Sequence, residues 1–430
     1  MVKAEWKPKE TYRAIILIQD GVGDRPIPKL GNKTPLQVAK KPNMDNIAKK
    51  GITGIMDPIE PGVRPGTDTG HIALFGYDPY KYYPGRGPLE AAGIGVKLEP
   101  GDVAIRCNVA TVKEEDGRLI VVDRRAGRIR GEHVKILVDA LNSSIKEVDG
   151  VKVEFYPATE HRVVLVLRGK DLSPKISDSD PGTAQEGNPV KKVVPLDDTE
   201  EARRTAEVVN KIIEMAYRTL KDHPLNKERV KEGLLPGNII ITRGAGMVPR
   251  DLVPFPKLFN ATAFIVAEEA TVVGAARIFG IEGTIPEGST ANLDTDLDAI
   301  YREVMKAYDK GYEIIFIHIK GPDIAGHDNN PKGKIKIIER TDKMLGKILK
   351  EIDRDKTIIA LAADHSTPCL VRDHSGDPVP VAIAGPGVRR DNVKSYDEFS
   401  CMHGGLGRIR GTSLIRIVLD LMNKPLKWGA

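Results

Sequence analysis

The sequence predicts an α/β protein with a doubly wound, mostly parallel sheet and a smaller α+β domain inserted into it. Three observations lead to this fold class: short apolar runs rich in Ile, helical patterns between them, and polar clusters directly after the runs. Short apolar runs of this kind indicate strands that are buried on both faces. Their alternation with helices favours a parallel sheet that is covered by helices on each side.

The expected elements of the main sheet are spread over both ends of the chain. Candidate strands cover residues 14–18, 238–242, 313–319, 357–362 and 379–383, and helical patterns cover 35–50, 296–309, 334–352 and 413–422. Ligands of such sheets bind beyond the carboxyl ends of the strands. The polar clusters that follow the strands are therefore expected to form the functional site.

The middle of the chain has a different pattern. Shorter strand-like runs separated by turn signals cover residues 103–111, 119–123, 151–156 and 162–167. A polar stretch at 173–190 indicates a long loop, and a charged amphipathic helix at 200–221 is expected to lead back to the main domain. The sequence thus predicts a core of residues 1–80 and 198–430 and an inserted domain of residues 81–197.

The composition excludes several classes of protein. The net charge is only +5 with 29% charged residues, which makes nucleic acid a poor first choice of partner and suits a small anionic substrate. Cys107, Cys369 and Cys401 lack CxxC spacing, as expected of incidental thiols in a reducing cytosol. No leader pattern follows Met1 and no apolar run reaches about 18 residues, so we expect a cytoplasmic protein without membrane contact. Abundant Lys, Arg, Glu and Ile with little Gln are typical of thermophiles.

Thr67 is the candidate nucleophile. It lies in a Pro-Gly-Thr-Asp-Thr-Gly-His stretch (residues 65–71) that ends in an apolar run, so it is expected at the start of a helix. Backbone N–H groups and the helix dipole favour an anion at that place. A threonine there could also be only a helix cap, because Thr is a favoured capping residue.

A set of Asp and His residues just past predicted strands offers metal ligands. Asp323 and His327 are spaced i, i+4, which places them on one face of a helical turn. Asp20, Asp364, His365 and His374 complete the set. A single Asp or His at a strand end is more often scaffold than ligand, but this many on one sheet indicate metal binding. Mixed carboxylate and imidazole ligands suit Mn²⁺, Zn²⁺ or Mg²⁺.

The ordered motifs resemble those of the archaeal type of 2,3-bisphosphoglycerate-independent phosphoglycerate mutase, a family of the alkaline phosphatase superfamily. The resemblance covers the chain from about residue 14 to its end. It is carried by the stretches at residues 20–24, 66–71 with 76–79, 323–327, 364–366 and 374–378. It implies a fold of alkaline-phosphatase type and interconversion of 3-phosphoglycerate and 2-phosphoglycerate in glycolysis or gluconeogenesis, without bisphosphoglycerate.

The resemblance also implies a ligand set and a cofactor. One metal ion would be held by Asp323, His327 and His374, and a second by Asp20, Thr67, Asp364 and His365. The two divalent ions are expected to be Mn²⁺, with Zn²⁺, Mg²⁺ or Co²⁺ as alternatives. The hydroxyl of Thr67 would take the phosphoryl group and return it to bound glycerate, over which the inserted domain would close. A homo-oligomer is a further possibility.

Arginines suit a substrate that bears a phosphate and a carboxylate. The inserted segment offers Arg106, Arg124, Arg125 and Arg128, some of which could equally be ordinary surface charges. His71 could orient the site or simply fill it. Weaker candidates are Lys320, Arg86, Arg130, Arg162, Arg243 and Arg408.

One departure from the family concerns the nucleophile. The family usually carries Ser at that position, whereas this chain has Thr67, whose extra methyl restricts the rotamer and crowds the oxygen. The change could slow transfer or mark a paralogue with another phosphorylated substrate. The alternatives are therefore a phosphomonoesterase or phosphonate hydrolase with the same threonine, and a degenerate, non-enzymatic binding protein that would lack ligands.

Overall fold

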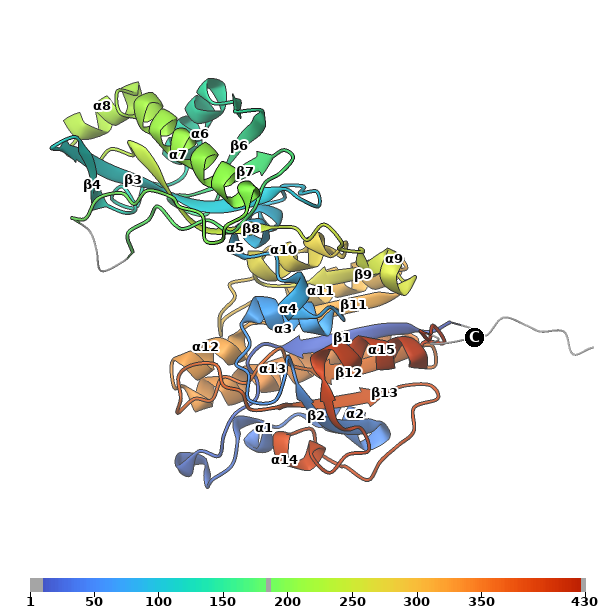
Figure 1. Cartoon of the computed structure of the whole chain (residues 1–430). Helices are drawn as coiled ribbons and strands as arrows, with labels where there is room; N and C mark the ends of the chain where they lie inside the picture. Colours follow the sequence, from blue (N-terminus) through green and yellow to red (C-terminus); the bar gives the residue numbers. More distant parts are fainter. Residues whose placement is uncertain (1–10, 183–186, 427–430) are drawn as a thin grey trace, which may run out of the picture. The chain divides into compact units, whose positions relative to one another are not determined.

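The protein consists of two compact units in the computed structural model, which describes residues 11–182 and 187–426 (Figure 1). The core unit comprises Met1–Tyr83 and Val253–Ala430, and the inserted unit comprises Pro84–Leu252. No helix in the described part of the chain is long and apolar enough to cross a bilayer. Cys107, Cys369 and Cys401 are buried free thiols. Parts of two predictions, the first residues of the core and positions 183–186 of the loop at 173–190, lie outside the described residues.

The core unit contains an eight-stranded, mostly parallel sheet, which confirms the predicted fold class. Residues at the predicted strands are almost completely buried because helices cover both faces, as their continuous apolar runs require. In sheet order the strands are β10 (Glu282–Thr284), β9 (Ala263–Val266), β11 (Ile314–Ile319), β1 (Arg13–Gln19), β12 (Thr357–Ala362), β13 (Val379–Ala384), β2 (Ile52–Asp57) and β14 (Gly407–Arg410).

One strand of this sheet runs against the others. β13 pairs antiparallel with both β12 and β2, whereas β1 pairs parallel with β11 and β12. The connection from β12 to β13 contains no crossover helix, and a parallel strand would need one. This connection instead carries Asp364, His365 and His374.

The helices of the core unit lie in two layers. Helices α2, α11 and α13 pack together on one side, and α3 packs with α10 and α15 on the other (Figure 1). The helix expected at 35–50 is split, because Pro42 cannot continue a helix and restricts Lys41 before it. The bounds are α1 (Pro35–Val38), α2 (Pro42–Lys50), α3 (Thr67–Leu74), α4 (Pro79–Tyr82), α9 (Phe255–Phe259), α10 (Ala270–Ile278), α11 (Leu297–Asp309), α12 (Gly321–His327), α13 (Pro331–Glu351), α14 (Glu398–Cys401) and α15 (Gly411–Leu421), with a short 3₁₀ turn η1 (Pro28–Leu30).

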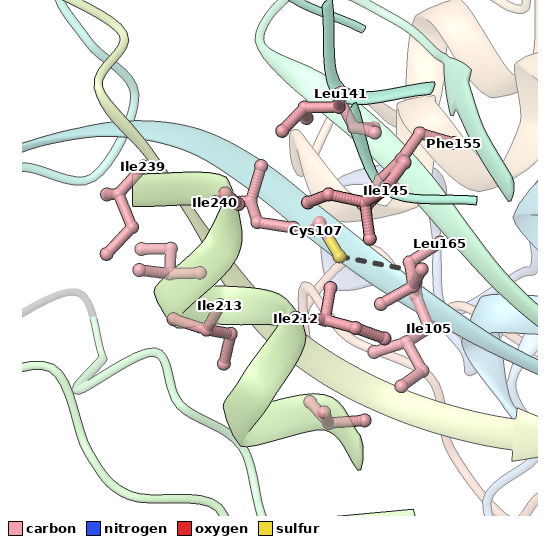
Figure 2. Close-up of a cluster of buried hydrophobic side chains, with 14 of the residues drawn as sticks. Ile105, Cys107, Leu141, Ile145, Phe155, Leu165, Ile212, Ile213, Ile239 and Ile240 are labelled. Atoms are coloured by element: carbon pink, nitrogen blue, oxygen red, sulfur yellow. Dashed lines mark hydrogen bonds between the residues drawn. The ribbon is translucent and has the colours of Figure 1, made fainter. Parts of the chain in front are cut away.

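The inserted unit contains an antiparallel sheet with helices on both faces. Its elements are α5 (Arg86–Gly93), β3 (Val103–Glu115), β4 (Arg118–Asp123), α6 (Glu132–Ser144), β5 (Glu147–Val148), β6 (Val151–Pro157), β7 (Arg162–Arg168), α7 (Glu200–Leu220), α8 (Pro224–Lys231) and β8 (Ile239–Met247). Figure 2 shows the apolar cluster in which Ile212 and Ile213 of α7 meet Ile105 and Leu165 of the sheet. A small second cluster lies under α5 on the other face.

The insertion is longer than the sequence indicates. The chain returns to the core unit at Val253, not near residue 198. The helix expected to lead back, α7, instead buries its apolar face in the core of the inserted unit. The strand expected at 238–242 is β8, which pairs antiparallel with β3 and not with the main sheet. Amphipathic periodicity shows that a helix has an apolar face, but not which sheet covers that face.

Candidate active site

The predicted polar clusters meet at one edge of the core sheet. β1 lies between β11 and β12, and the three strands are parallel. Asp20 directly follows β1, Asp323 lies on α12 after β11, and Asp364 with His365 follows β12. Parallel neighbours bring their carboxyl ends together, so residues that are far apart in the chain become a single cluster.

Asp20, Asp364 and His365 form what we call the buried donor group. The Nε2 atom of His365 lies 3.1 Å from Oδ1 of Asp20 and 3.4 Å from Oδ2 of Asp364, and all three side chains are fully buried. Among the described residues neither of these two carboxylate oxygens has a hydrogen-bond partner. Burial alone would lower the pKa of His365, but Asp364 and Asp20 outweigh it and raise the pKa to about 9.

Asp323, His327 and His374 form the open donor group. The Nε2 atoms of both histidines lie 3.4 Å from Oδ1 of Asp323, and the side chains of His327 and His374 remain 37% and 19% exposed. The Nδ1 atom of each histidine contacts a backbone carbonyl oxygen. Nδ1 of His327 lies 3.0 Å from the oxygen of Arg372, and Nδ1 of His374 lies 2.7 Å from the oxygen of Pro65. These contacts assign the Nδ1–H tautomer and leave Nε2 for the group.

The donor atoms lie close enough to one another to hold a metal ion. One set is Asp20/Glu269/His318, and two more are Asp20/Asp364/His365 and Asp323/His365/His374; the atoms of each set lie within 4.8 Å of one another. His365 belongs to both of the latter sets, and its ring stacks on that of His374 with centroids 3.7 Å apart. Buried carboxylate oxygens without hydrogen bonds are costly unless a cation or a proton compensates them. Their mixture with imidazole suits Mn²⁺ or Zn²⁺.

Thr67 is the first residue of α3, and Gly66, not Thr67, is the N-cap. Its Oγ1 atom lies 3.3 Å from Nε2 of His365 and accepts a hydrogen bond of 3.3 Å from Nζ of Lys320. The positive charge of Lys320 beside this oxygen favours a negative charge on it. The structure therefore brings the predicted nucleophile against the buried donor group and does not use it as a cap.

Lys320 contacts the donor groups as well as Thr67. Its Nζ atom lies 3.1 Å from Oδ2 of Asp20, 2.8 Å from Oδ2 of Asp323 and 3.5 Å from Oε2 of Glu269. Burial opposes its charge, but these three carboxylates outweigh burial and raise its pKa. Lys320 is thus a cation held beside Thr67.

His71 lies behind Thr67. Its side chain is fully buried, and its Nδ1 atom is 2.7 Å from the backbone oxygen of Thr67 and 3.4 Å from Oδ2 of Asp364. Of the two roles expected for His71, orienting the site or filling it, this position suits the first.

His318 is a contact that the sequence interpretation missed. It lies within β11, fully buried, and its Nε2 atom is 2.8 Å from Oδ2 of Asp20. The backbone N–H of Glu268 donates to its Nδ1 at 3.4 Å, so Nε2 carries the proton toward Asp20. This hydrogen bond, with that from Lys320, occupies Oδ2 and leaves Oδ1 of Asp20 for the donor group. The only signal was a histidine inside an otherwise apolar strand, two residues before Lys320.

Three arginines of the inserted unit lie on one face of its sheet, which we call the arginine face: Arg106, Arg162 and Arg243. Arg106 of β3 is directly opposite Arg243 of β8, and Asn108 is opposite Arg162 of β7, so the period of two puts all three on the face of α5. Burial lowers the pKa of Arg106, and the charges of the neighbouring arginines, including Arg86, lower it further. Glu90 partly opposes this shift. The Nε atom of Arg106 is 2.9 Å from Oε2 of Glu90.

The other predicted arginines are distributed differently. Arg124 is buried, and its Nε and Nη2 atoms pair with the carboxylate of Asp180. Its expected contact with the substrate stays a prediction. Arg408 is likewise occupied by Asp57 at 2.6 and 2.8 Å. Arg125, Arg128 and Arg130 are exposed. Ala126 and Arg128 have positive φ values of 47° and 59°, a strained turn of the kind that collects at functional sites.

Comparison with known proteins identifies related sequences along almost the whole chain. Residues 48–226 match a family model described as 2,3-bisphosphoglycerate-independent phosphoglycerate mutase. Proteins of that name from Methanosphaera stadtmanae and Ignicoccus hospitalis are 48% and 47% identical to this chain. The alignments cover 97% of this chain in both cases, and 100% and 99% of those proteins.

Two solved structures are similar along their full length. The PH0037 protein of Pyrococcus horikoshii matches with a TM-score of 0.79 and 38% identity over 98% of this chain and 100% of that one. The cofactor-independent phosphoglycerate mutase of Thermoplasma acidophilum matches with a TM-score of 0.74 and 36% identity, over 96% and 100% of the two chains.

Proposed function

The chain belongs to the 2,3-bisphosphoglycerate-independent phosphoglycerate mutases, which are isomerases, and from this premise we propose a phosphothreonine mechanism at a site for two metal ions. In this mechanism Thr67 takes the phosphoryl group of 3-phosphoglycerate and returns it to the other hydroxyl of glycerate. The observation that carries the proposal is the position of Oγ1 of Thr67, 3.3 Å from both His365 and Lys320.

The two donor groups would hold the metal ions. Asp20, Asp364, His365 and Thr67 would bind one divalent ion, and Asp323, His327 and His374 the other, with Mn²⁺ as our first choice and no bisphosphoglycerate. Bound there, such ions lower the pKa of a hydroxyl and neutralise charge on phosphoryl oxygens.

The chain's own residues prepare the nucleophile and the transferred group. Lys320 stabilises the Thr67 oxygen after it loses its proton, and the N-terminal dipole of α3 favours negative charge at the same place. As the bond from Oγ1 to phosphorus forms, the bond from phosphorus to the C3 oxygen breaks, and that oxygen gains the proton that Thr67 has lost. The reverse exchange at the C2 oxygen then releases Thr67 unchanged.

The arginine face is proposed to bind the anionic groups of the substrate. Like charges opposite each other on antiparallel strands are destabilising, and Glu90 is a single carboxylate beside several guanidinium groups. A bound carboxylate or phosphate would compensate the surplus through bidentate hydrogen bonds. Arg125 and Arg128, exposed on the strained turn, are proposed to contribute to the same function.

Phosphorus NMR of the purified chain with 3-phosphoglycerate and Mn²⁺, without bisphosphoglycerate, tests the proposal. We expect 2-phosphoglycerate to accumulate to equilibrium with almost no inorganic phosphate. A gain of one phosphoryl group on the peptide that carries Thr67 should be visible by mass spectrometry after an acid quench. Release of phosphate without 2-phosphoglycerate would instead identify a phosphomonoesterase. This is the specific alternative, because the chain has Thr67 where the family usually has a serine.

A further inference from the structure

Thr367 lies between the two donor groups and contacts both. It is fully buried in the connection between β12 and β13. Its Oγ1 atom is 2.6 Å from Oδ1 of Asp323, in the open group, and 3.0 Å from Nδ1 of His365, in the buried group. A single hydroxyl therefore joins a donor of one group to a donor of the other.

The chemistry of the three partners fixes the direction of both hydrogen bonds. A carboxylate can only accept, so the hydroxyl of Thr367 donates its one proton to Asp323. The hydroxyl oxygen must then accept from Nδ1–H of His365. Nδ1 therefore keeps its proton, and Nε2, which faces Oδ1 of Asp20 and Oδ2 of Asp364, is the nitrogen that is left for a metal ion.

The backbone of Thr367 is held on both sides. Its N–H donates to the carbonyl oxygens of Gly21 and Gly23 at 3.2 and 3.1 Å, and its own carbonyl oxygen accepts from Nζ of Lys334 at 2.9 Å. The same Nζ binds Oδ2 of Asp24 at 3.0 Å and is fully buried. These bonds connect the loop after β1, helix α13 and the loop after β12.

Two glycines make room for this threonine. A Cβ atom at Gly21, whose φ is +60°, would lie 2.4 Å from Oγ1 of Thr367, and one at Gly326 would lie 2.3 Å from its carbonyl oxygen. Both distances are far below van der Waals contact. The loop after β1 and helix α12 thus approach Thr367 as closely as a backbone without side chains permits.

We propose that Thr367 is a positioning residue shared by both metal sites. Its hydroxyl sets the tautomer and ring orientation of His365 and the orientation of Asp323, so its loss weakens metal binding in both groups at once. The inference rests on the two-metal function proposed above. It differs from a packing role, which would depend on the methyl group and not on the hydroxyl.

Mn²⁺ titration of the metal-stripped full chain, followed by calorimetry, tests the proposal with three variants. Thr367→Val keeps the shape and removes the hydroxyl, and we expect about 10- to 100-fold weaker binding at both sites, as for other outer-shell partners. Thr367→Ser keeps the hydroxyl and should bind within a few-fold of the unsubstituted chain. Ser366→Ala is the matched control, because the neighbouring Ser366 is buried and its hydroxyl has no hydrogen-bond partner in the described part of the chain. Its affinities should not change.

Several outcomes would overturn the shared role. These are unchanged affinities in Thr367→Val, weakening at one site only, or equal weakening in the Val and Ser variants. Should the Val variant not fold, ¹⁵N-histidine NMR of the unsubstituted chain with bound Mg²⁺ decides, since loss of the proton from Nδ1 of His365 and not from Nε2 contradicts the proposal. If the unsubstituted chain binds no Mn²⁺, the proposed function itself fails, and the role of Thr367 with it.

Discussion

The donor groups of the core unit and the arginine face of the inserted unit differ in the polar groups that they offer to a ligand. In the core unit, buried oxygens of Asp20 and Asp364 lack hydrogen bonds within the described chain. In the inserted unit, Arg106 and Arg243 lie opposite each other on adjacent strands. Carboxylate oxygens of the first region suit cations, and guanidinium groups of the second suit anions. This agrees with the proposal that metal ions bind in the core unit and substrate anions in the inserted unit.

Each unit also contains a buried ion pair that is balanced internally. Lys334 faces Asp24 in the core unit, and Arg124 faces Asp180 in the inserted unit. Each pair joins segments that lie far apart in the sequence, so it helps to hold those segments in place. The contrast separates charges kept for stability from charges kept for binding, and it can be tested residue by residue.

The largest effect is expected at Thr67. Thr67→Ala removes the proposed phosphoryl acceptor and should lower kcat by on the order of 10³-fold or more, whereas Thr67→Ser should keep substantial activity. A coupled assay for 2-phosphoglycerate measures both variants. Normal turnover of the alanine variant would show that Thr67 is not the nucleophile.

The next effect concerns the balanced pair of the core unit. Lys334→Met leaves Asp24 buried without its cation, which should cost about 3–5 kcal/mol of unfolding free energy. The double variant Lys334→Met/Asp24→Asn should lose less than the sum of the single losses. Urea unfolding measures these differences, and a single-variant cost near zero would remove Lys334 from the set of structural charges.

A smaller effect is expected on the arginine face. Arg106→Met and Arg243→Met should each raise KM for 3-phosphoglycerate by about 10- to 100-fold, the loss of a charge-assisted hydrogen bond. Arg243→Met should not lower stability, because one of two opposed like charges is removed. Arg106→Met also removes the ion-pair partner of Glu90 and should cost some stability. Arg118→Met is the control, since Arg118 is an exposed arginine at the start of β4, a strand that carries none of these three arginines. An equal rise in KM for the control would point to nonspecific attraction.

The smallest effect is a pH dependence of stability from Glu398. Burial, opposed by hydrogen bonds from Thr34 and Asp24 and by the charge of Lys334, raises the pKa of Glu398 to about 7. Because this pKa is raised above the unfolded value, its contribution to stability is complete at low pH and is lost as pH rises through about 7. Glu398→Gln should therefore reduce the fall in unfolding free energy between pH 5 and pH 8, by about 1–3 kcal/mol. Urea unfolding of both chains at a series of pH values measures this. If the unfolding free energy falls equally with pH in both chains, Glu398 does not cause the pH dependence.

Much of the core unit was predictable because its signals are local. Continuous apolar runs located β1, β11 and β12, and helical periodicity located α11, α13 and α15, within a few residues of the observed bounds. The motif order was specific enough to indicate the family that the comparisons confirm. His318 escaped because a histidine in an apolar strand has the same pattern as an ordinary core residue.

The sequence by itself determined the fold class, the family and the candidate ligands, because parallel strands place whatever follows them at one edge of the sheet. Only the tertiary structure decided which charges are free. No local pattern indicates, for example, that Arg124 pairs with Asp180, 56 positions away. The tertiary structure also assigned α7 and β8 to the inserted unit and placed Thr367 between the donor groups. Pairing across such distances depends on which surfaces the folded chain buries together, and no local pattern records that choice.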